Sequence, residues 1–157
     1  MQLTQHTDYS LRVLIYLSLQ PARLCTITEI ADFYGISRNH LMKVVHSLGL
    51  LGFIETVRGK HGGLRLARPA VDIRVGDVAR STEPNFHIAE CFDHKTNHCS
   101  ITDVCRLKSI LFQARTAFLE TLDSYTIADA ISDRIGALAL LWKPLAMPAK
   151  RRVPARK

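Results

Sequence analysis

Three of the four cysteines lie close together in a polar segment without a regular hydrophobic pattern. Seven residues separate Cys91 from Cys99 and five separate Cys99 from Cys105, whereas Cys25 is remote from them. Structural zinc sites normally use closely paired ligands, so this loose spacing favours an iron-sulfur cluster, which thiolates on an irregular loop can hold. Zinc, a redox-active thiol pair and unliganded cysteines stay open as alternatives.

Three thiolates leave one coordination position to be filled. The loop offers His94, His98 and Asp93, and Cys25 and Asp8 are more distant candidates. Asp8 also has a plain structural role available, because an acid in the first turn of a helix is favourable. Cys25 lies in an apolar setting and is better interpreted as a buried core thiol.

A second group of residues is basic and gathers in the first half of the chain. The only acid between residues 35 and 68 is Glu55, and the bases there are Arg38, Lys43, Arg58, Lys60, Arg65 and Arg68. Such a local excess indicates a surface for a polyanion such as DNA.

Helices precede and enter this basic segment. An apolar helix is expected from about residue 7 to just before Pro21, and a second, short helix over about residues 28–34. Ser37 is a plausible cap for a third helix, whose apolar side recurs at i, i+3, i+4 and i+7: Leu41, Val44, Val45 and Leu48. Its opposite side carries polar and basic groups.

A hairpin follows, with strands at about residues 53–57 and 64–67 and a turn at 58–63 that contains three glycines. A helix over about residues 75–82 closes the unit. The pattern predicts a mainly α fold with a small β-hairpin wing, a winged helix-turn-helix with a long dimerisation helix after it.

This fold predicts which side chains meet DNA. Asn39, His40 and Lys43 would lie near base edges in the major groove, and the hairpin tip would meet phosphates or the minor groove. The predicted DNA-contacting residues are Ser37, Arg38, Asn39, His40, Lys43, Arg58, Gly59, Lys60 and His61.

A long helix is expected over about residues 102–125, with Thr102 as its cap and Cys105 in its first turn, where the helix dipole favours a thiolate. Thr126 and Asp129 then have the spacing of a capping box for another short helix. The long helix carries an apolar stripe that is expected to pack against a partner: Val104, Leu107, Leu111, Ala114 and Phe118.

The expected organisation has four parts. Residues 1–83 form the DNA-binding domain and 84–105 the cluster-binding loop. Residues 106–135 form the dimerisation helix and the short helix after it. Residues 136–157 form a flexible basic tail that accounts for most of the net charge of +7.

Composition excludes several classes of protein. A chain of 157 residues, 47% of them hydrophobic, can bury one ordinary core. Its longest apolar stretch, residues 135–142, is far too short to span a membrane, and residues 1–8 do not resemble a secretion signal, so we expect a cytoplasmic protein with reduced thiols. No nucleotide-binding glycine loop, nucleophile elbow or pair of catalytic carboxylates indicates an enzyme.

Four sequence features together resemble the Rrf family of winged-helix regulators, over about residues 1–131. They are TDYSLR at residues 7–12, SRNH at 37–40, RGKHGG at 58–63 and the three cysteines. The likeness is to the nitric-oxide-sensitive repressors of that family. It implies a homodimer on a double-stranded, palindromic DNA operator, with nitric oxide as the signal.

The resemblance also implies a two-iron or four-iron cluster in each subunit. Cys91, Cys99 and Cys105 match its ligands, and Asp8 matches the carboxylate proposed to complete the site from the opposite subunit. Two alternatives stay open: a regulator that senses iron-sulfur status or oxidation, and a zinc-stabilised DNA-binding protein.

Overall fold

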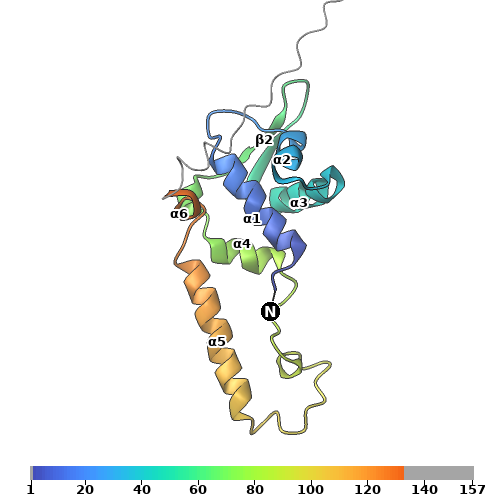
Figure 1. Cartoon of the computed structure of the whole chain (residues 1–157), viewed down its shortest axis with the longest axis vertical. Coiled ribbons are helices and arrows are strands. Elements are labelled where there is room, and N and C mark those ends of the chain that lie inside the picture. Colours follow the sequence, from blue (N-terminus) through green and yellow to red (C-terminus); the bar gives the residue numbers. More distant parts are fainter. Residues whose placement is uncertain (1, 133–157) are drawn as a thin grey trace, which may run out of the picture.

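The structure, a computed structural model, describes residues 2–132 (Figure 1). The expected tail at 136–157 and the apolar stretch at 135–142 lie outside this range. Among the described helices, none is both long and apolar enough to cross a membrane. The elements in chain order are α1 (Gln5–Ser18), α2 (Ile27–Tyr34), α3 (Arg38–Leu50), β1 (Ile54–Val57), β2 (Gly63–Leu66), a 3-10 turn (Ala70–Asp72), α4 (Val75–Thr82), a second 3-10 turn (Glu90–Phe92), α5 (Arg106–Asp123) and α6 (Asp129–Ser132).

The core forms where α1, α2 and α3 pack together against the hairpin. Leu14 of α1, Ile30 of α2 and Leu41 of α3 are fully buried in it. All four apolar positions predicted for the third helix are buried, while the opposite side of α3 is exposed. The predicted fold class, mainly helical with a two-stranded wing, is confirmed.

The hairpin is joined to the core by a third piece of extended chain. β1 and β2 pair antiparallel, with Ile54 opposite Leu66 and Val57 opposite Gly63. Cys25 adds an isolated bridge to Leu64, with N···O distances of 3.0 and 2.8 Å. The Cys25 side chain is fully buried and burial raises the pKa of its thiol, as expected of a core cysteine.

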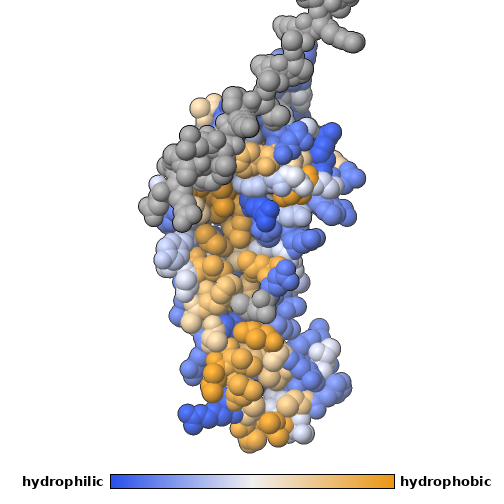
Figure 2. Space-filling model, in the orientation of Figure 1, coloured by the Kyte–Doolittle hydropathy of each residue, from blue (hydrophilic) through white to orange (hydrophobic). Residues whose placement is uncertain are grey.

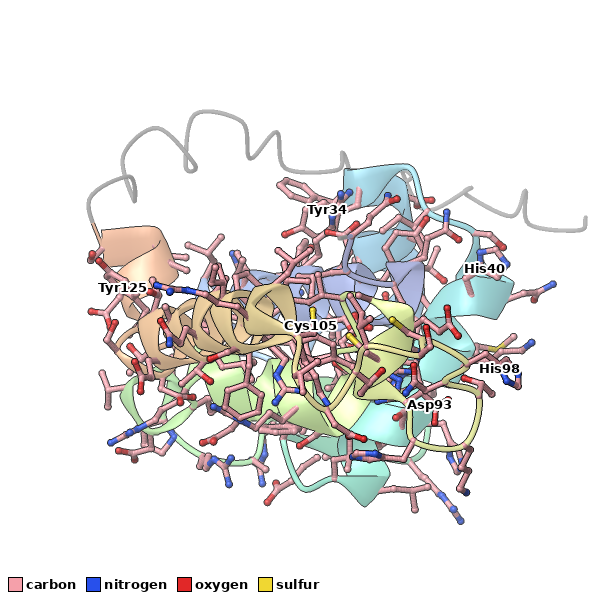
Figure 3. The ribbon with its side chains drawn as sticks, turned by 90° about the horizontal axis from the view of Figure 1, so that it is seen from below. Tyr34, His40, Asp93, His98, Cys105 and Tyr125 are labelled. Atoms are coloured by element: carbon pink, nitrogen blue, oxygen red, sulfur yellow. The ribbon has the colours of Figure 1, made fainter. Side chains whose placement is uncertain are left out.

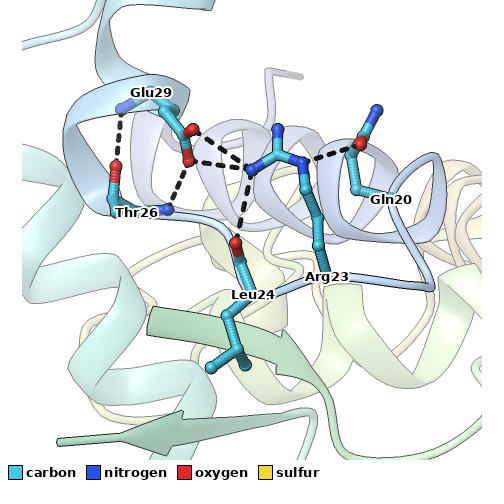
Figure 4. Close-up of polar contacts among 5 residues, drawn as sticks. All are labelled: Gln20, Arg23, Leu24, Thr26 and Glu29. Carbon is cyan, nitrogen blue, oxygen red and sulfur yellow. Dashed lines mark hydrogen bonds and ion pairs between the residues drawn. The ribbon is translucent and has the colours of Figure 1, made fainter. Parts of the chain in front are cut away.

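The connection from α1 to α2 is fixed by a small polar network (Figure 4). The Thr26 hydroxyl accepts from the Glu29 N–H at 3.2 Å, and the Glu29 carboxylate accepts from the Thr26 N–H at 2.7 Å, which completes a capping box. Arg23 donates to Glu29 at 3.1 Å and to Gln20 at 2.9 Å. The network fixes the entry of α2 and therefore its packing against α3.

After α5 the chain returns to the core that α1, α2, α3 and the hairpin form. The Val75 N–H donates to the Tyr125 carbonyl and the Ile127 N–H to the Ile73 carbonyl, both at 2.9 Å. Ile127 is 1% exposed within the core cluster. The predicted capping box of Thr126 and Asp129 is present at the start of α6.

Helices α4 and α5 approach closely where the returning chain leaves α5. Arg80 of α4 forms a two-pronged ion pair with Asp123 of α5, and these hydrogen bonds hold the pKa of the Asp123 carboxyl below its usual range. A Cβ atom at Gly76 would lie 1.9 Å from Asp123 Oδ1. A larger residue at this position would therefore displace the Arg80–Asp123 ion pair.

Two local predictions need correction. The long helix begins at Arg106, not at Thr102, because the Thr102 hydroxyl donates to the Cys99 carbonyl at 2.7 Å and so stabilises a turn instead. Cys105 is consequently the residue that precedes the first turn of α5. Ser37 occupies the predicted cap position of α3, but its side chain makes no capping hydrogen bond.

Candidate nucleic-acid interface and cysteine loop

The outer side of α3 presents hydrogen-bonding groups to solvent. Arg38, Asn39 and Lys43 are exposed, and within the described residues their side chains make no hydrogen bond or ion pair. His40 is also exposed, at the outer edge of α3 (Figure 3). The buried side of the same helix fixes it against the core. Such a helix can be inserted into a groove without losing internal contacts.

The wing turn is exposed and its backbone depends on glycine. Arg58, Lys60 and His61 are all exposed. Gly59 has φ +110°, in the region that favours glycine, and the Gly62 N–H donates back to its carbonyl at 3.0 Å. A Cβ at Gly62 would lie 2.1 Å from the Val57 carbonyl oxygen. The tight turn therefore carries its three cationic or titratable side chains outward.

Two arginines of the basic segment are engaged within the protein. Arg65 pairs across the strands with Glu55 at 2.7 Å. The Arg68 guanidinium lies 5.1 Å from the Phe53 ring centroid. Of the bases in this segment, only Arg65 has an acidic partner among the described residues, so the unpaired positive charge lies on α3, in the wing turn and at Arg68.

The start of α1 touches both α3 and the end of α4. His6 Nε2 lies 3.3 Å from Ser47 Oγ of α3. The buried Thr82 hydroxyl of α4 donates to the buried Thr7 hydroxyl at 2.9 Å. The sequence gives no signal for this polar contact, since nothing in it pairs Thr7 with Thr82. It joins α1 to the point at which the cysteine loop leaves the core.

Asp8 lies in the first turn of α1, with its carboxylate held by Arg12. The two contacts measure 2.8 Å (Nη2 to Oδ2) and 3.0 Å (Nε to Oδ1), and both side chains are partly exposed. The same guanidinium lies 5.9 Å from the ring of Tyr34, whose burial raises its pKa to about 12. Asp8 would have to leave Arg12, at least in part, to bind a metal.

The cysteine loop is ordered by its own short polar contacts. The Glu90 carboxylate accepts from the His98 N–H at 2.5 Å, and Asn97 Oδ1 accepts from the Cys99 N–H at 3.1 Å. Asp93 accepts from the Lys95 N–H at 2.9 Å, and this hydrogen bond lowers the pKa of the Asp93 carboxyl. Figure 3 shows Asp93 and His98 on this loop and Cys105 at the start of α5.

The three loop cysteines are free thiols, with Cys91 and Cys105 half-buried and Cys99 exposed. Within residues 2–132, no three His, Cys, Asp or Glu side chains are close enough to hold a metal ion. The donor set nevertheless suits iron, since three reduced thiols lie on one loop. Cys25 is unavailable to this set because it is buried beside Leu64.

An aromatic contact that the sequence did not reveal joins the loop to α5. The Arg115 guanidinium lies 5.0 Å from the Phe92 ring centroid and 4.6 Å from that of Phe112. The spacing of Phe112 and Arg115 places them on one helix face, but nothing in the sequence pairs either with Phe92.

Helix α5 extends away from the core and has no buried residue over its 18 positions. Figure 2 shows apolar surface along it. The predicted stripe is not uniformly exposed, because Leu111 and Phe118 are half-buried. The residues that are exposed at heptad spacing form a row that shares two members with the stripe and is called the outward row below: Leu107, Ile110, Ala114, Ala117 and Thr121.

Comparison with known proteins agrees with this architecture. A family model described as Rrf2, iron-dependent transcriptional regulator, matches residues 3–133. The HTH-type transcriptional regulators NsrR of Halalkalibacterium halodurans and of Bacillus subtilis are each 49% identical to this chain over 142 residues, which cover 90% of this chain and 97% of each relative.

Solved structures show the same fold. The T. potens IscR structure has a TM-score of 0.67 at 27% identity, covering 85% of this chain and 88% of that one. CymR, the global cysteine regulator of B. subtilis, has a TM-score of 0.68 at 22% identity, covering 85% of this chain and 98% of that one. The latter likeness shows the fold alone.

The fold, the exposed α3 and these relatives define a winged-helix, DNA-binding transcriptional regulator. The chain belongs to the Rrf2 family of iron-dependent transcriptional regulators. The expectation that it is not an enzyme is confirmed by the family match and by relatives that are transcriptional regulators.

Proposed function

We propose that this regulator is a cytoplasmic homodimer that represses genes of nitric oxide detoxification, holds an iron-sulfur cluster, and releases its operator on exposure to nitric oxide. The observation that carries the proposal is the position of three reduced thiols on a loop that leads directly into an unpartnered helix. The iron-dependent family description and the sequence resemblance to nitric-oxide-sensitive repressors support it.

The DNA would be read by α3 and the wing. Asn39, His40 and Lys43 are in reach of base edges if α3 enters the major groove, with Ser37 at its entry. Phosphate contacts fall to the residues around the helix start and the turn: Arg38, Arg58, Gly59, Lys60 and His61. In a symmetric dimer the two copies of α3 would meet half-sites about 34 Å apart, which predicts a palindromic operator.

The dimer would form through α5. Most of the stability of a helix in a protein comes from packing of an apolar face, and α5 buries none of its residues within one chain. Its outward row offers Leu107 and Ile110 as apolar contacts, and Ala114 and Ala117 are small enough for close approach. A second copy of the chain presents the same row and would bury both.

Cys91, Cys99 and Cys105 would hold the cluster, with Asp8 of the partner subunit as the fourth ligand. A bound cluster supplies iron, to which nitric oxide binds avidly. Arg12 holds the carboxylate of Asp8 at the surface of α1 until it is needed. Loss of the metal from the three thiolates would allow the loop to move. Because Cys105 directly precedes α5, this movement would reach the helix.

The coupling needs only a modest energy. If the metal-bound loop favours the dimer geometry that fits the operator by about 3 kcal/mol, operator affinity changes by roughly a hundredfold. The change requires no unfolding of the DNA-reading core.

Anaerobic purification followed by visible absorption and by counts of iron and sulfide tests the cofactor. Duplexes selected from a random pool then serve as the operator probe, with nitric oxide and an iron chelator added in parallel. Release by nitric oxide supports the proposal. Release by the chelator alone indicates an iron-status sensor, and a colourless zinc protein contradicts the proposal.

A further inference from the structure

Arg115 stands between the loop and α5 in an unusual setting. Its guanidinium lies between two aromatic rings, that of Phe92 beside Cys91 and that of Phe112 one helical turn away on α5. Arg115 is half-buried, and within the described residues it has no ion pair or hydrogen bond. Its charge is therefore directed at the faces of the rings, where a cation is attracted by the π electrons.

No other polar link performs this task. Among the described residues, no hydrogen bond or ion pair joins residues 84–104 to α5. The loop's own hydrogen bonds all run within residues 85–104. The aromatic stack is thus the specific interaction that holds the first half of the loop beside the helix.

The stack encloses a small hollow next to a thiol. This hollow, of about 170 Å³, is lined by Cys91, Phe92, His94, Lys108, Phe112 and Arg115. Cys91 is therefore tied to α5 through its neighbour Phe92, and Cys105 is tied to it by the chain itself. Cys99 lies between these two attachments and is exposed.

We propose that Arg115 is a positioning residue that clasps the Cys91 end of the loop to α5, so that two of the three thiols stay near the helix before metal binds. This inference rests on the proposed function for its biological purpose. The clasp itself belongs to the metal-free chain and can be measured there.

Hydrogen exchange of the full chain, purified metal-free under anaerobic, reducing conditions, tests the clasp. Arg115→Met removes the charge and retains the length, and Arg106→Met makes the same change on the same helix at an exposed residue without aromatic contacts. We expect amides of residues 89–95 to exchange about fivefold to thirtyfold faster in Arg115→Met, as expected for the loss of two cation–π contacts. Arg115→Lys should be intermediate, and Arg106→Met should match the wild type.

Equal exchange in Arg115→Met and the wild type would overturn the proposal. So would the same acceleration in Arg106→Met, or an acceleration of equal size in the core helices, which would indicate general destabilisation. In the iron-loaded chain, Arg115→Met should also lose visible absorbance to a chelator several times faster than Arg106→Met. If the chain loads no iron, the proposed function fails, but the exchange experiment still decides the role of Arg115.

Discussion

The described chain divides into a body and an arm that are stabilised in different ways. The body, residues 2–82 with 127–132, contains every buried side chain, whereas none of residues 83–126 is buried. The body therefore carries its own hydrophobic core, and the arm does not. The DNA-reading part therefore has a complete core within one chain, whereas the loop and α5 have no core of their own.

The largest effect expected from a single substitution is on the body. Leu41→Ala should lower the free energy of unfolding by about 2–5 kcal/mol, because Leu41 is fully buried in α3. The same truncation in the arm, Leu107→Ala, should change it by less than about 0.5 kcal/mol in the monomer, because Leu107 is 60% exposed. Urea unfolding in dilute solution measures both, and equal losses would break the distinction between body and arm.

A charge placed on the outward row of α5 tests whether the arm is stabilised by a second copy of the chain. Ile110→Lys should weaken self-association by at least about thirtyfold, as expected at the centre of an apolar interface, and leave the unfolding of the body unchanged. Ser109→Lys places the same charge on a different face of α5 and serves as the control. Sedimentation velocity over a range of concentrations would report on both, and a matching loss in the control would argue against the α5 dimer.

Within the body, two substitutions separate base reading from charge. Asn39→Ala should cost about 1–3 kcal/mol on the selected operator and little on unrelated DNA. Lys60→Ala should weaken binding to the operator and to unrelated DNA alike. It should also reduce the slope of log K against log salt concentration by about 0.9 per lost phosphate contact. Fluorescence anisotropy at several salt concentrations distinguishes them. Loss of affinity for all DNA in Asn39→Ala would contradict the proposed docking of α3.

The smallest effect concerns a cap at the edge of the body. Thr26→Ala removes the hydroxyl that accepts from the Glu29 N–H and should cost about 1 kcal/mol. Thr28→Ala, on the same helix and without a side-chain hydrogen bond among the described residues, is the control. Urea unfolding at pH 7 compares the two variants. Equal losses in the free energy of unfolding would contradict a stabilising role for the Thr26 cap.

The same network gives a pH dependence. Burial alone would raise the pKa of Glu29, but hydrogen bonds from Thr26 and Arg23 outweigh burial and lower it. Because the pKa is lower in the folded than in the unfolded chain, the contribution of Glu29 is present above about pH 4.3 and is lost as the pH falls through the folded value. Glu29→Gln should therefore cost more stability at pH 7 than at pH 2, as urea unfolding at the two pH values would show.

The sequence predicted the body better than the arm because the burial of one face of a helix requires apolar residues at regular spacing. The spacing of Leu41, Val44, Val45 and Leu48 predicted both the burial of α3 and the direction of its polar side. The glycines predicted the wing, since its turn requires a positive φ at Gly59. In the arm no core imposes such a period, so the first residue of α5 was misplaced, and the role of its apolar stripe stays a prediction.

Contacts between distant segments were beyond prediction for another reason. Nothing in the residue types pairs Phe92 with Arg115 or Thr7 with Thr82, because each contact depends on how the loop and helices lie in space. The three cysteines could be recognised as candidate metal ligands from their chemistry and spacing alone. Their gathering around a metal, and the part of Asp8 in it, stay predictions.

The missing side chain at Gly76 has a consequence for the range of operators that such a protein can recognise. The Arg80–Asp123 ion pair lies over this residue and joins the arm to the body, so it contributes to the tilt of the arm. In a pair joined along their arms, that tilt would fix the separation of the two reading heads. A change at this one backbone position would therefore re-space the heads along the double helix without altering any residue that touches a base.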